Sequence, residues 1–266
     1  MFVSASVTCF FAPVIDTPKN SGSIGVGFTI DKGVEVRLAD RTTLNGEKIR
    51  MPTLEYILSK LGYEGGVEIR TDLPLGCGFG LSGAIALASA LEVNERRNLN
   101  LSLFQVADLA HEAEVLNRTG LGDVTTQCHG GFVVRKDALT PSMCRVDKFL
   151  WDIEMDFLIM GELKTSEILE GNLKEIYKTG VDCLKKFLKK PSIHNLFKVS
   201  KEFTLRCGFA DDDVIDAIEA VESNGGLASM IMLGKGVFAL NGDVLRELKG
   251  FYTKSRVVWY GIRKSL

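Results

Sequence analysis

The sequence predicts a protein of the α+β class with two domains. Short strand-like segments are grouped apart from mixed helices, whereas a doubly wound α/β sheet would alternate strands and helices regularly. The chain has 266 residues, of which 45% are hydrophobic and 25% charged. This composition is ordinary for a globular protein, and the length is enough to bury one large core or two smaller ones.

The first part of the chain mixes short strands, glycine-rich turns and helices. The apolar run at residues 9–14 fits a core strand, and residues 66–71 alternate apolar and polar side chains as a half-buried strand does. We expect helices over residues 52–61, 81–97 and 101–117, the last capped by Asn100 or Ser102. The apolar segment at residues 131–135 is expected to be a strand that closes this part.

The second part of the chain, after Trp151, is richer in helices. We expect strands at residues 155–160, 236–240 and 255–261, and helices at residues 172–190, 192–203 and 212–223. The boundary is placed near Asp147, which gives one domain over residues 1–147 and a second over residues 148–266.

The most informative segment is a glycine-rich loop, P-L-G-C-G-F-G-L-S-G-A, at residues 74–84. It joins the strand expected at residues 66–71 to an alanine-rich helix. Unpaired backbone N–H groups and the helix dipole make such a helix N-terminus favourable for anions, and glycines let phosphate oxygens approach the backbone. The segment therefore predicts a phosphate site, although close packing alone also produces glycine-rich turns.

Two familiar nucleotide motifs are missing from the sequence. The P-loop pattern G-x-x-x-x-G-K-[ST] does not occur, and the glycines of the loop do not complete the dinucleotide pattern G-x-G-x-x-G followed by an acid. The loop is instead similar to the phosphate loop of the GHMP kinase superfamily, which reads roughly P-x-G-x-G-L-G-S-S-A.

The register of that resemblance is carried by Pro74 and by Gly76, Gly78 and Gly80. Phe79 and Leu81 depart from the family pattern, and Gly83 replaces an alanine. The residues that the resemblance assigns to the nucleotide are Pro74, Gly76, Gly78, Gly80, Ser82 and Gly83.

Two downstream motifs extend the resemblance: A-H-E-A-E at residues 110–114 and T-G-L-G-D at residues 119–123, followed by two glycines. The family pattern implies that Ser82 and Glu114 hold Mg²⁺ and that Asp123 is the catalytic residue. Hydroxyl and carboxylate oxygens are ligands that Mg²⁺ accepts. Glu112 is an alternative metal ligand, and either glutamate could instead lie on a solvated helix face. Asp123 could also be a turn or cap residue.

A third motif lies at residues 225–240, where the family has a loop of small residues that closes over the phosphates. Here the glycine pattern is incomplete, and we expect Met230, Met232 and Leu233 to belong to the core. Together the three motifs imply a two-domain GHMP kinase fold, with a ribosomal-protein-like N-terminal domain, a ferredoxin-like C-terminal domain and a substrate cleft between them.

Within the superfamily, the sequences of these motifs are most similar to those of the archaeal pantoate kinases. The resemblance implies transfer of phosphate from ATP to (R)-pantoate, giving 4-phosphopantoate for coenzyme A biosynthesis, with ATP and Mg²⁺ as cofactors. Two alternatives stay open: another GHMP small-molecule kinase, of the homoserine, shikimate or mevalonate type, and a ligand sensor of the same fold without catalysis.

An acid with two hydroxyls needs a cation or N–H groups for its carboxylate and polar groups for its hydroxyls. We expect Ser21, Ser23 and Arg135 to bind the substrate, although an arginine at a strand end is often simply solvated. Mevalonate-type kinases place a lysine near the acceptor oxygen, but residues 8–13 contain none and Lys19 comes late. Whether Asp123 is a true base therefore stays open.

Bulk properties narrow the range of partners. The net charge of −2 gives no electrostatic reason to expect nucleic acid or an anionic membrane as a partner. No segment is apolar enough to span a bilayer, and the first residues lack the basic region of a secretory signal. Six scattered cysteines without a C-x-x-C pair indicate reduced thiols in a cytoplasmic protein. The resemblance leaves a homodimer open.

Overall fold

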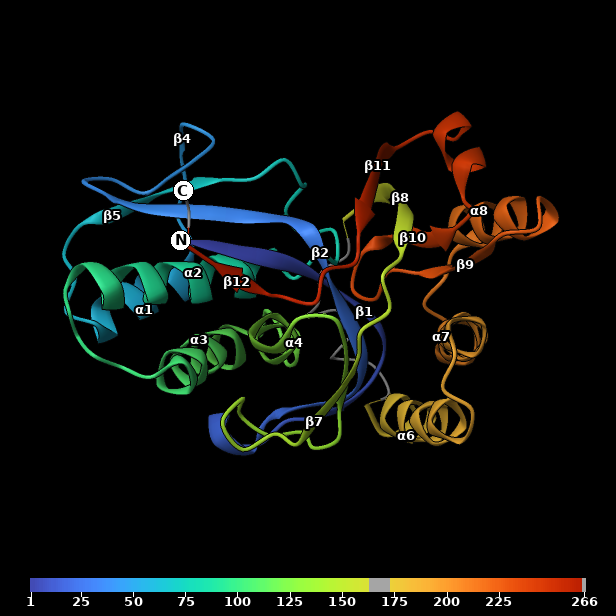
Figure 1. The fold of residues 1–266 in the computed structure, drawn as a ribbon, viewed down its shortest axis with the longest axis horizontal. Helices are drawn as coiled ribbons and strands as arrows, with labels where there is room; N and C mark the ends of the chain where they lie inside the picture. The colour runs from blue at the N-terminus through green and yellow to red at the C-terminus, as the bar shows by residue number, and fades with distance from the viewer. Residues whose placement is uncertain (163–172, 265–266) are drawn as a thin grey trace.

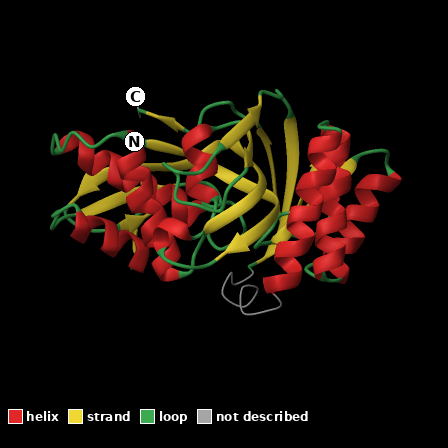
Figure 2. Cartoon of the chain, turned by 90° about the horizontal axis from the view of Figure 1, so that it is seen from below, coloured by secondary structure: helices red, strands yellow, loops and turns green. Residues whose placement is uncertain are grey.

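Two β-sheets organise the computed structural model, which describes residues 1–162 and 173–264. In the described residues, one sheet has eight strands: six follow the order β12-β1-β2-β5-β3-β4, β6 pairs with β2, and β7 pairs with β6. The other has four strands in the order β11-β8-β10-β9. Figure 1 shows the two sheets and their helices side by side, and Figure 2 shows helices covering the sheets. This arrangement confirms the predicted α+β class.

In chain order the elements are β1 (Phe2–Val14), η1 (Pro18–Asn20), β2 (Gly22–Ala39), β3 (Thr43–Leu44), β4 (Glu47–Lys48), α1 (Pro52–Lys60), β5 (Gly66–Arg70), α2 (Leu81–Arg96), α3 (Leu103–Asn117), α4 (Asp123–His129), β6 (Phe132–Arg135), β7 (Val146–Phe149), β8 (Glu154–Gly161), α6 (Leu173–Lys189), α7 (Ile193–Cys207), α8 (Asp212–Ser223), β9 (Leu227–Met230), β10 (Lys235–Leu240), η2 (Asp243–Glu247), β11 (Phe251–Arg256) and β12 (Ile262–Arg263).

The strands β1 and β2 form a long antiparallel hairpin through the middle of the molecule. The sequence predicts only its apolar part at residues 9–14, because the glycines of β2 interrupt the strand pattern. Two of these glycines lie where the strands approach closely: a Cβ would be 2.3 Å from the Phe10 carbonyl oxygen at Gly25 and 2.1 Å from that of Val3 at Gly33. The register shifts nearby, between Ser4 and Ser6 and between Thr8 and Phe10. Such irregularities bend a strand, so β2 pairs with β6 at one end and with β5 at the other.

The alanine-rich helix α2 is the central helix of the first sheet. It contacts β1, β2, α1, α3 and α4, and its residues 83–90 are buried on every side. Small side chains allow this all-round burial, and the four alanines among residues 83–90 are also strong helix formers. Helix α3 is capped by Ser102, whose hydroxyl accepts from the Gln105 N–H in a capping box. One of the two predicted caps is therefore the observed one.

The second sheet packs against helices α7 and α8, and α6 packs against both α7 and β1. Two features cross between the parts of the chain. The strand β12 returns to pair with the beginning of β1, and Ile30 bridges to Val257. The strand β7 spans the expected boundary at Asp147 and pairs with β6. The division into residues 1–147 and 148–266 stays a prediction.

Some elements differ from expectation. The last long strand is β11, at Phe251–Arg256, so the strand predicted at residues 255–261 is placed too late. Residues 123–129 form the helix α4 rather than only a turn, and the small-residue motif contributes the strand β9. A helix is predicted at residues 172–190. Residue 172 lies outside the described residues, and α6 is described from Leu173. In the part of the chain that the structure describes, no helix is both long and apolar enough to cross a bilayer.

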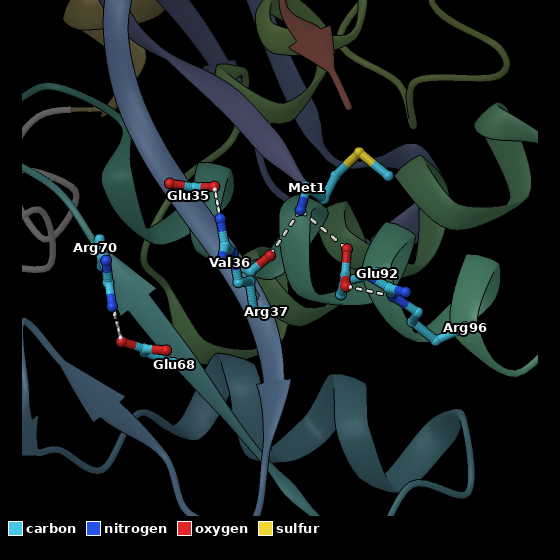
Figure 3. A network of polar contacts seen from close by, with 8 residues as sticks. All are labelled: Met1, Glu35, Val36, Arg37, Glu68, Arg70, Glu92 and Arg96. Atoms are coloured by element: carbon cyan, nitrogen blue, oxygen red, sulfur yellow. Dashed lines mark hydrogen bonds and ion pairs between the residues drawn. The ribbon is translucent and has the colours of Figure 1, made fainter. Parts of the chain in front are cut away.

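A buried ionic network joins the start of β1 to α2. The amino group of Met1 donates to the Val36 carbonyl oxygen at 2.7 Å and to Glu92 Oε2 at 2.9 Å, and Arg96 donates to Glu92 Oε1 at 3.0 Å (Figure 3). Burial raises the pKa of Glu92, but these two cationic donors outweigh it and leave the pKa below its usual value. The ionised carboxylate is therefore a stabilising group.

We predict that Glu92→Gln lowers the free energy of unfolding at pH 7 by about 1–3 kcal/mol, since charged hydrogen bonds to a buried group are lost. A carboxyl whose pKa is lowered by folding contributes stability above its unfolded pKa, and that stability disappears as the pH falls through the folded pKa. The difference from wild type should therefore shrink in acid, as urea denaturation at pH 7 and pH 3 would measure.

Glu95→Gln is the matched control for this prediction. Glu95 lies on the same helix and pairs with Lys264, but its side chain is half exposed. Surface pairs of this kind contribute about 0–1 kcal/mol. Equal losses in the two variants, or a pH-independent loss in Glu92→Gln, would contradict the account.

Candidate active site

The glycine loop connects the end of β5 to the start of α2 and has a backbone that only glycine adopts easily. Gly76, Gly78 and Gly80 have φ values of +72°, +82° and +59°. Space is limiting as well: a Cβ would lie 2.6 Å from Ile231 Cγ2 at Gly78, and 2.3 Å from Ser6 Oγ at Gly80. These glycines are therefore required both by conformation and by close packing.

The N-terminus of α2 opens into a cavity. Its N-cap is Gly80, and no side chain of the described residues caps it. The first turn thus has backbone N–H groups and the positive end of the helix dipole available to an anion. The cavity is lined by Thr8, Gly76, Gly78, Phe79, Gly80, Leu81, Ser82, Glu114, Thr119, Asp123, Met232 and Leu233. The sequence-predicted residues Gly76, Gly78, Gly80, Ser82, Glu114 and Asp123 are among them.

Glu114 projects from α3 toward the start of α2. Its Oε1 accepts hydrogen bonds from the Ser82 hydroxyl at 2.6 Å and from the Thr119 hydroxyl at 2.7 Å. Burial raises the pKa of Glu114 to about 7, the two hydroxyl donors oppose that rise, and the nearby charge of Asp123 adds to it. A cation bound beside Glu114 would stabilise the ionised form of this buried carboxylate.

Glu112, the alternative metal ligand, is directed elsewhere. Its Oε1 accepts a hydrogen bond from the Tyr56 hydroxyl of α1 at 2.7 Å. Positions two apart on a helix face nearly opposite directions. Glu112 consequently does not line the cavity, and the geometry favours Glu114.

Asp123 is the first residue of α4 and faces the glycine loop. Its Oδ1 accepts from the Ser6 hydroxyl at 2.8 Å. The side-chain amide of Gln127 donates to Ser6 Oγ at 3.1 Å and to the Gly80 carbonyl oxygen at 2.8 Å. Burial raises the pKa of Asp123, while the Ser6 hydrogen bond and the positive charge of Arg135 oppose the rise.

Ser6 and Gln127 are site residues that sequence reasoning missed. Ser6 is a polar residue in an apolar strand, and Gln127 lies one helical turn after Asp123, where i and i+4 side chains share a face. The i, i+4 spacing of Asp123 and Gln127 could have identified Gln127 from the sequence if residues 123–129 had been predicted to be a helix.

The three predicted substrate residues lie in different surroundings. Ser23 lines a second, smaller cavity that shares Thr8, Asp123 and Leu233 with the first. Arg135 is 1% exposed and lines neither cavity, so it is not a solvated strand-end residue. Its Nε donates to the Ser23 carbonyl oxygen at 3.0 Å, and its Nη1 donates to the Thr126 hydroxyl at 2.6 Å.

The guanidinium of Arg135 lies directly behind the loop before Asp123. A Cβ at Gly122 would be 2.8 Å from Arg135 Cζ and 2.4 Å from Ser23 Oγ. Ser21, in contrast, is buried away from both cavities: its hydroxyl accepts from the Asp16 N–H at 2.8 Å. Direct contact of Ser21 or Arg135 with a substrate stays a prediction.

The turn between β9 and β10 packs on the glycine loop. Met230 and Met232 are buried as predicted, but Met232 and Leu233 also line the cavity, so they are more than core residues. The Met232 N–H donates to the Thr8 carbonyl oxygen at 3.2 Å, and a Cβ at Gly234 would lie 2.2 Å from the Cys77 carbonyl oxygen. Lysine is not among the described residues that line either cavity, and Lys19 is exposed in η1.

Comparison with known proteins shows which family the chain belongs to. Residues 48–131 match the family model of the GHMP kinases N terminal domain. The chain is 35% identical over 254 residues to a pantoate kinase of Methanocaldococcus jannaschii, covering 91% of this chain and 92% of that protein. It is 34% identical over 265 residues to a pantoate kinase of Thermococcus kodakarensis, covering 91% and 87%.

A solved structure described as a phosphotransferase related to the CoA biosynthesis pathway is also similar. It matches with a TM-score of 0.86 at 28% identity and covers 98% of this chain and 96% of its own. The fold is that of a GHMP kinase. Within that class, the chain belongs to the pantoate kinase family. The resemblance predicted from the motifs is confirmed.

We predict that Gly80→Ala weakens MgATP binding by at least about tenfold, because the new methyl group would displace Ser6 and Asp123 beside the helix N-terminus. Calorimetric titration with a non-hydrolysable ATP analogue measures the loss. Gly62→Ala is the matched control, since Gly62 has a φ of +61° with nothing within 4 Å of a Cβ. Equal weakening in both variants would show that backbone strain alone is responsible.

Proposed function

We propose that this chain transfers the γ-phosphoryl group of ATP to the 4-hydroxyl of (R)-pantoate, giving 4-phosphopantoate and ADP. In an archaeal cell this reaction would serve coenzyme A biosynthesis. The observation that carries the proposal is the position of Asp123, which lines both the cavity at the glycine loop and the adjoining cavity at Ser23. A carboxylate that lines both cavities would be able to hold an acceptor hydroxyl beside a bound phosphate.

The nucleotide phosphates would lie at the start of α2. Gly76, Gly78 and Gly80 let the backbone approach them, and the N–H groups of Ser82 and Gly83 in the first turn would donate to them. Pro74 precedes these residues and would restrict the loop entrance. ATP use is what membership of the GHMP kinases supports for this chain.

The donor set fits Mg²⁺. Ser82 Oγ and Glu114 Oε1 are 2.6 Å apart at the cavity wall, and both are hard oxygen atoms. The described residues contain no cluster of three histidine, cysteine or acidic side chains that could hold a metal alone. This suits Mg²⁺, which is commonly bound by one or two carboxylates together with substrate phosphates and water. When bound, the ion would neutralise charge that develops on the phosphates.

Asp123 would orient the acceptor. Ser6 holds Oδ1 at 2.8 Å, which leaves Oδ2 to accept a hydrogen bond from the acceptor hydroxyl. Phosphoryl transfer depends mainly on positioning and charge stabilisation, so orientation of that hydroxyl is a sufficient role for Asp123. The proton can leave through the same hydrogen bond as the oxygen–phosphorus bond forms.

The carboxylate of the acceptor would lie toward Ser23. The hydroxyl and N–H groups there are donors, and the Arg135 guanidinium behind Ser23 adds positive charge in a region of low dielectric. Ser21 would support this end of the site by fixing the backbone between η1 and β2.

Two features of the setting also belong to this proposal. A cytoplasmic location suits the cysteines, which are all free in the described residues, and a homodimer is the assembly we would expect to find by light scattering.

The direct test is ADP release from MgATP with purified protein and a panel of acceptors: pantoate, homoserine, shikimate and mevalonate. Turnover with pantoate alone supports the proposal. Turnover with another acceptor would keep the kinase and change its substrate. ATP binding without turnover on any of the four would favour the sensor alternative.

We predict that Asp123→Asn lowers kcat by about 100- to 10,000-fold while MgATP affinity changes little, since the role of Asp123 is at the acceptor. Because the pKa of Asp123 is raised, activity should fall in acid as the carboxylate takes up a proton. Ser6→Ala removes a hydrogen bond that favours the ionised form, so it should move this acidic limb of the kcat/KM profile to higher pH.

Ser4→Ala is the control for Ser6→Ala. Ser4 is buried on the same strand, and its hydroxyl has no hydrogen-bond partner among the described residues. An unmoved acidic limb in Ser6→Ala, or the same movement in Ser4→Ala, would argue against the role of Ser6.

For the metal ligands we predict that Glu114→Gln raises the Mg²⁺ concentration needed for half-maximal activity by at least about tenfold, because a neutral amide attracts a cation less strongly. Glu112→Gln is the matched variant on the same helix and should leave the Mg²⁺ requirement unchanged. Steady-state rates over a Mg²⁺ titration distinguish the two, and the opposite ranking would reassign the metal to Glu112.

A further inference from the structure

The small cavity beyond Asp123 is lined by both polar and apolar side chains. The polar ones are Thr8, Ser23 and Asp123, and the apolar ones, here called the apolar wall, are Phe11, Leu121 and Leu233. Small-molecule sites typically combine apolar contact with a few polar groups that fix the orientation of the ligand. The presence of both kinds of side chain therefore carries information about the chemistry of the acceptor.

Two of the apolar side chains are held firmly. The Phe11 ring is 4% exposed and packs edge-on against Phe203 at 5.5 Å and in a stacked pair with Phe209 at 6.4 Å. Leu233 has a φ of +64°, a conformation that a leucine rarely adopts. Such strain persists only where the surrounding structure enforces it, and it is frequent at ligand sites. Here the turn that carries Leu233 is held by the hydrogen bond from Met232 to Thr8.

Leu121 is the third residue of the apolar wall. It is half-buried and lies between Gly120 and Gly122, two residues before Asp123. Its position in the chain therefore ties the apolar wall to the residue that we assign to the reacting hydroxyl. A Cβ at Gly120 would be 2.5 Å from Glu114 Oε2, so this segment is also fixed against the proposed metal ligand.

The chemistry of the acceptor matches this division. If its hydroxyl is at Asp123 and its carboxylate is near Ser23, the carbon next to the reacting CH₂ group lies between them, beside the apolar wall. In pantoate that carbon bears two methyl groups, whereas in homoserine it bears none. Two methyl groups on this carbon would pack against the apolar wall, whereas an unbranched carbon would leave the apolar wall in contact with water.

We infer that Leu121, with Phe11 and Leu233, determines acceptor specificity by packing against a dimethyl-substituted carbon next to the phosphorylated hydroxymethyl group. This inference rests on the proposed function and deepens it, because it names the part of the acceptor that these side chains recognise. Leu121 is the residue to test, since Phe11 belongs to the aromatic core and its truncation would disturb folding.

The experiment compares kcat/KM for (R)-pantoate and for 2,4-dihydroxybutanoate, the same acid without the two methyl groups. We expect the wild type to prefer pantoate by about 100-fold, the scale of selectivity that one or two buried methyl groups provide. Leu121→Ala should reduce this preference to about tenfold or less, by raising KM for pantoate while leaving the unbranched acid almost unaffected. Leu121→Met, which keeps the apolar volume, should retain most of the preference.

Leu116→Ala is the matched control, because Leu116 is 53% exposed on α3 and lines neither cavity. It should behave as wild type with both acceptors. The inference is wrong if the wild type uses both acids equally, or if Leu121→Ala slows both to the same extent. If the wild type phosphorylates homoserine or mevalonate instead of pantoate, the proposed function fails first and this inference fails with it.

Discussion

The active site depends on one buried hydrogen-bond network around Ser6. The Gln127 amide donates to both the Ser6 hydroxyl and the Gly80 carbonyl oxygen, and Ser6 in turn donates to Asp123. These bonds join the first strand, the glycine loop and the helix α4, which are far apart in the sequence. Because Gln127 and Ser6 are almost entirely buried, an unmade bond would leave a polar group without water, so the network holds the three segments in a fixed arrangement.

In the proposed function this arrangement would align two substrates. Asp123 lines both the cavity at the start of α2 and the cavity at Ser23. The close packing of Gly80 against Ser6 and Asp123 leaves no room for a side chain at this position of the glycine loop. Glu114 is anchored to the same helix through Ser82, so the proposed metal ligand shares this rigid frame.

The charges of the site follow from the same geometry. Burial raises the pKa of both Glu114 and Asp123, and the two carboxylates repel each other. Burial lowers the pKa of Arg135, and the charge of Asp123 opposes that change. A bound cation would stabilise the ionised carboxylates, so the proposed site would gain affinity for MgATP from groups that are unfavourable when alone.

Much of this could be predicted from the sequence because the informative residues are local. The loop from Pro74 to Gly83 and its helix are identified by glycine spacing, and Glu114 and Asp123 follow in the resembling motifs. Long-range partners could not be predicted in this way: Ser6 meets Asp123 across 117 residues, and Arg135 meets Ser23 across 112. The long strand β2 was missed because its glycines serve close strand contacts, which only the paired strand reveals.

The most direct test of the account is a crystal structure with Mg²⁺, a non-hydrolysable ATP analogue and (R)-pantoate. The account predicts the γ-phosphate at the N-terminus of α2, the 4-hydroxyl of pantoate within hydrogen-bond distance of Asp123 Oδ2, and its carboxylate toward Ser23. A pantoate bound with its carboxylate at Asp123, or a nucleotide whose phosphates lie away from Gly76, Gly78 and Gly80, would contradict it.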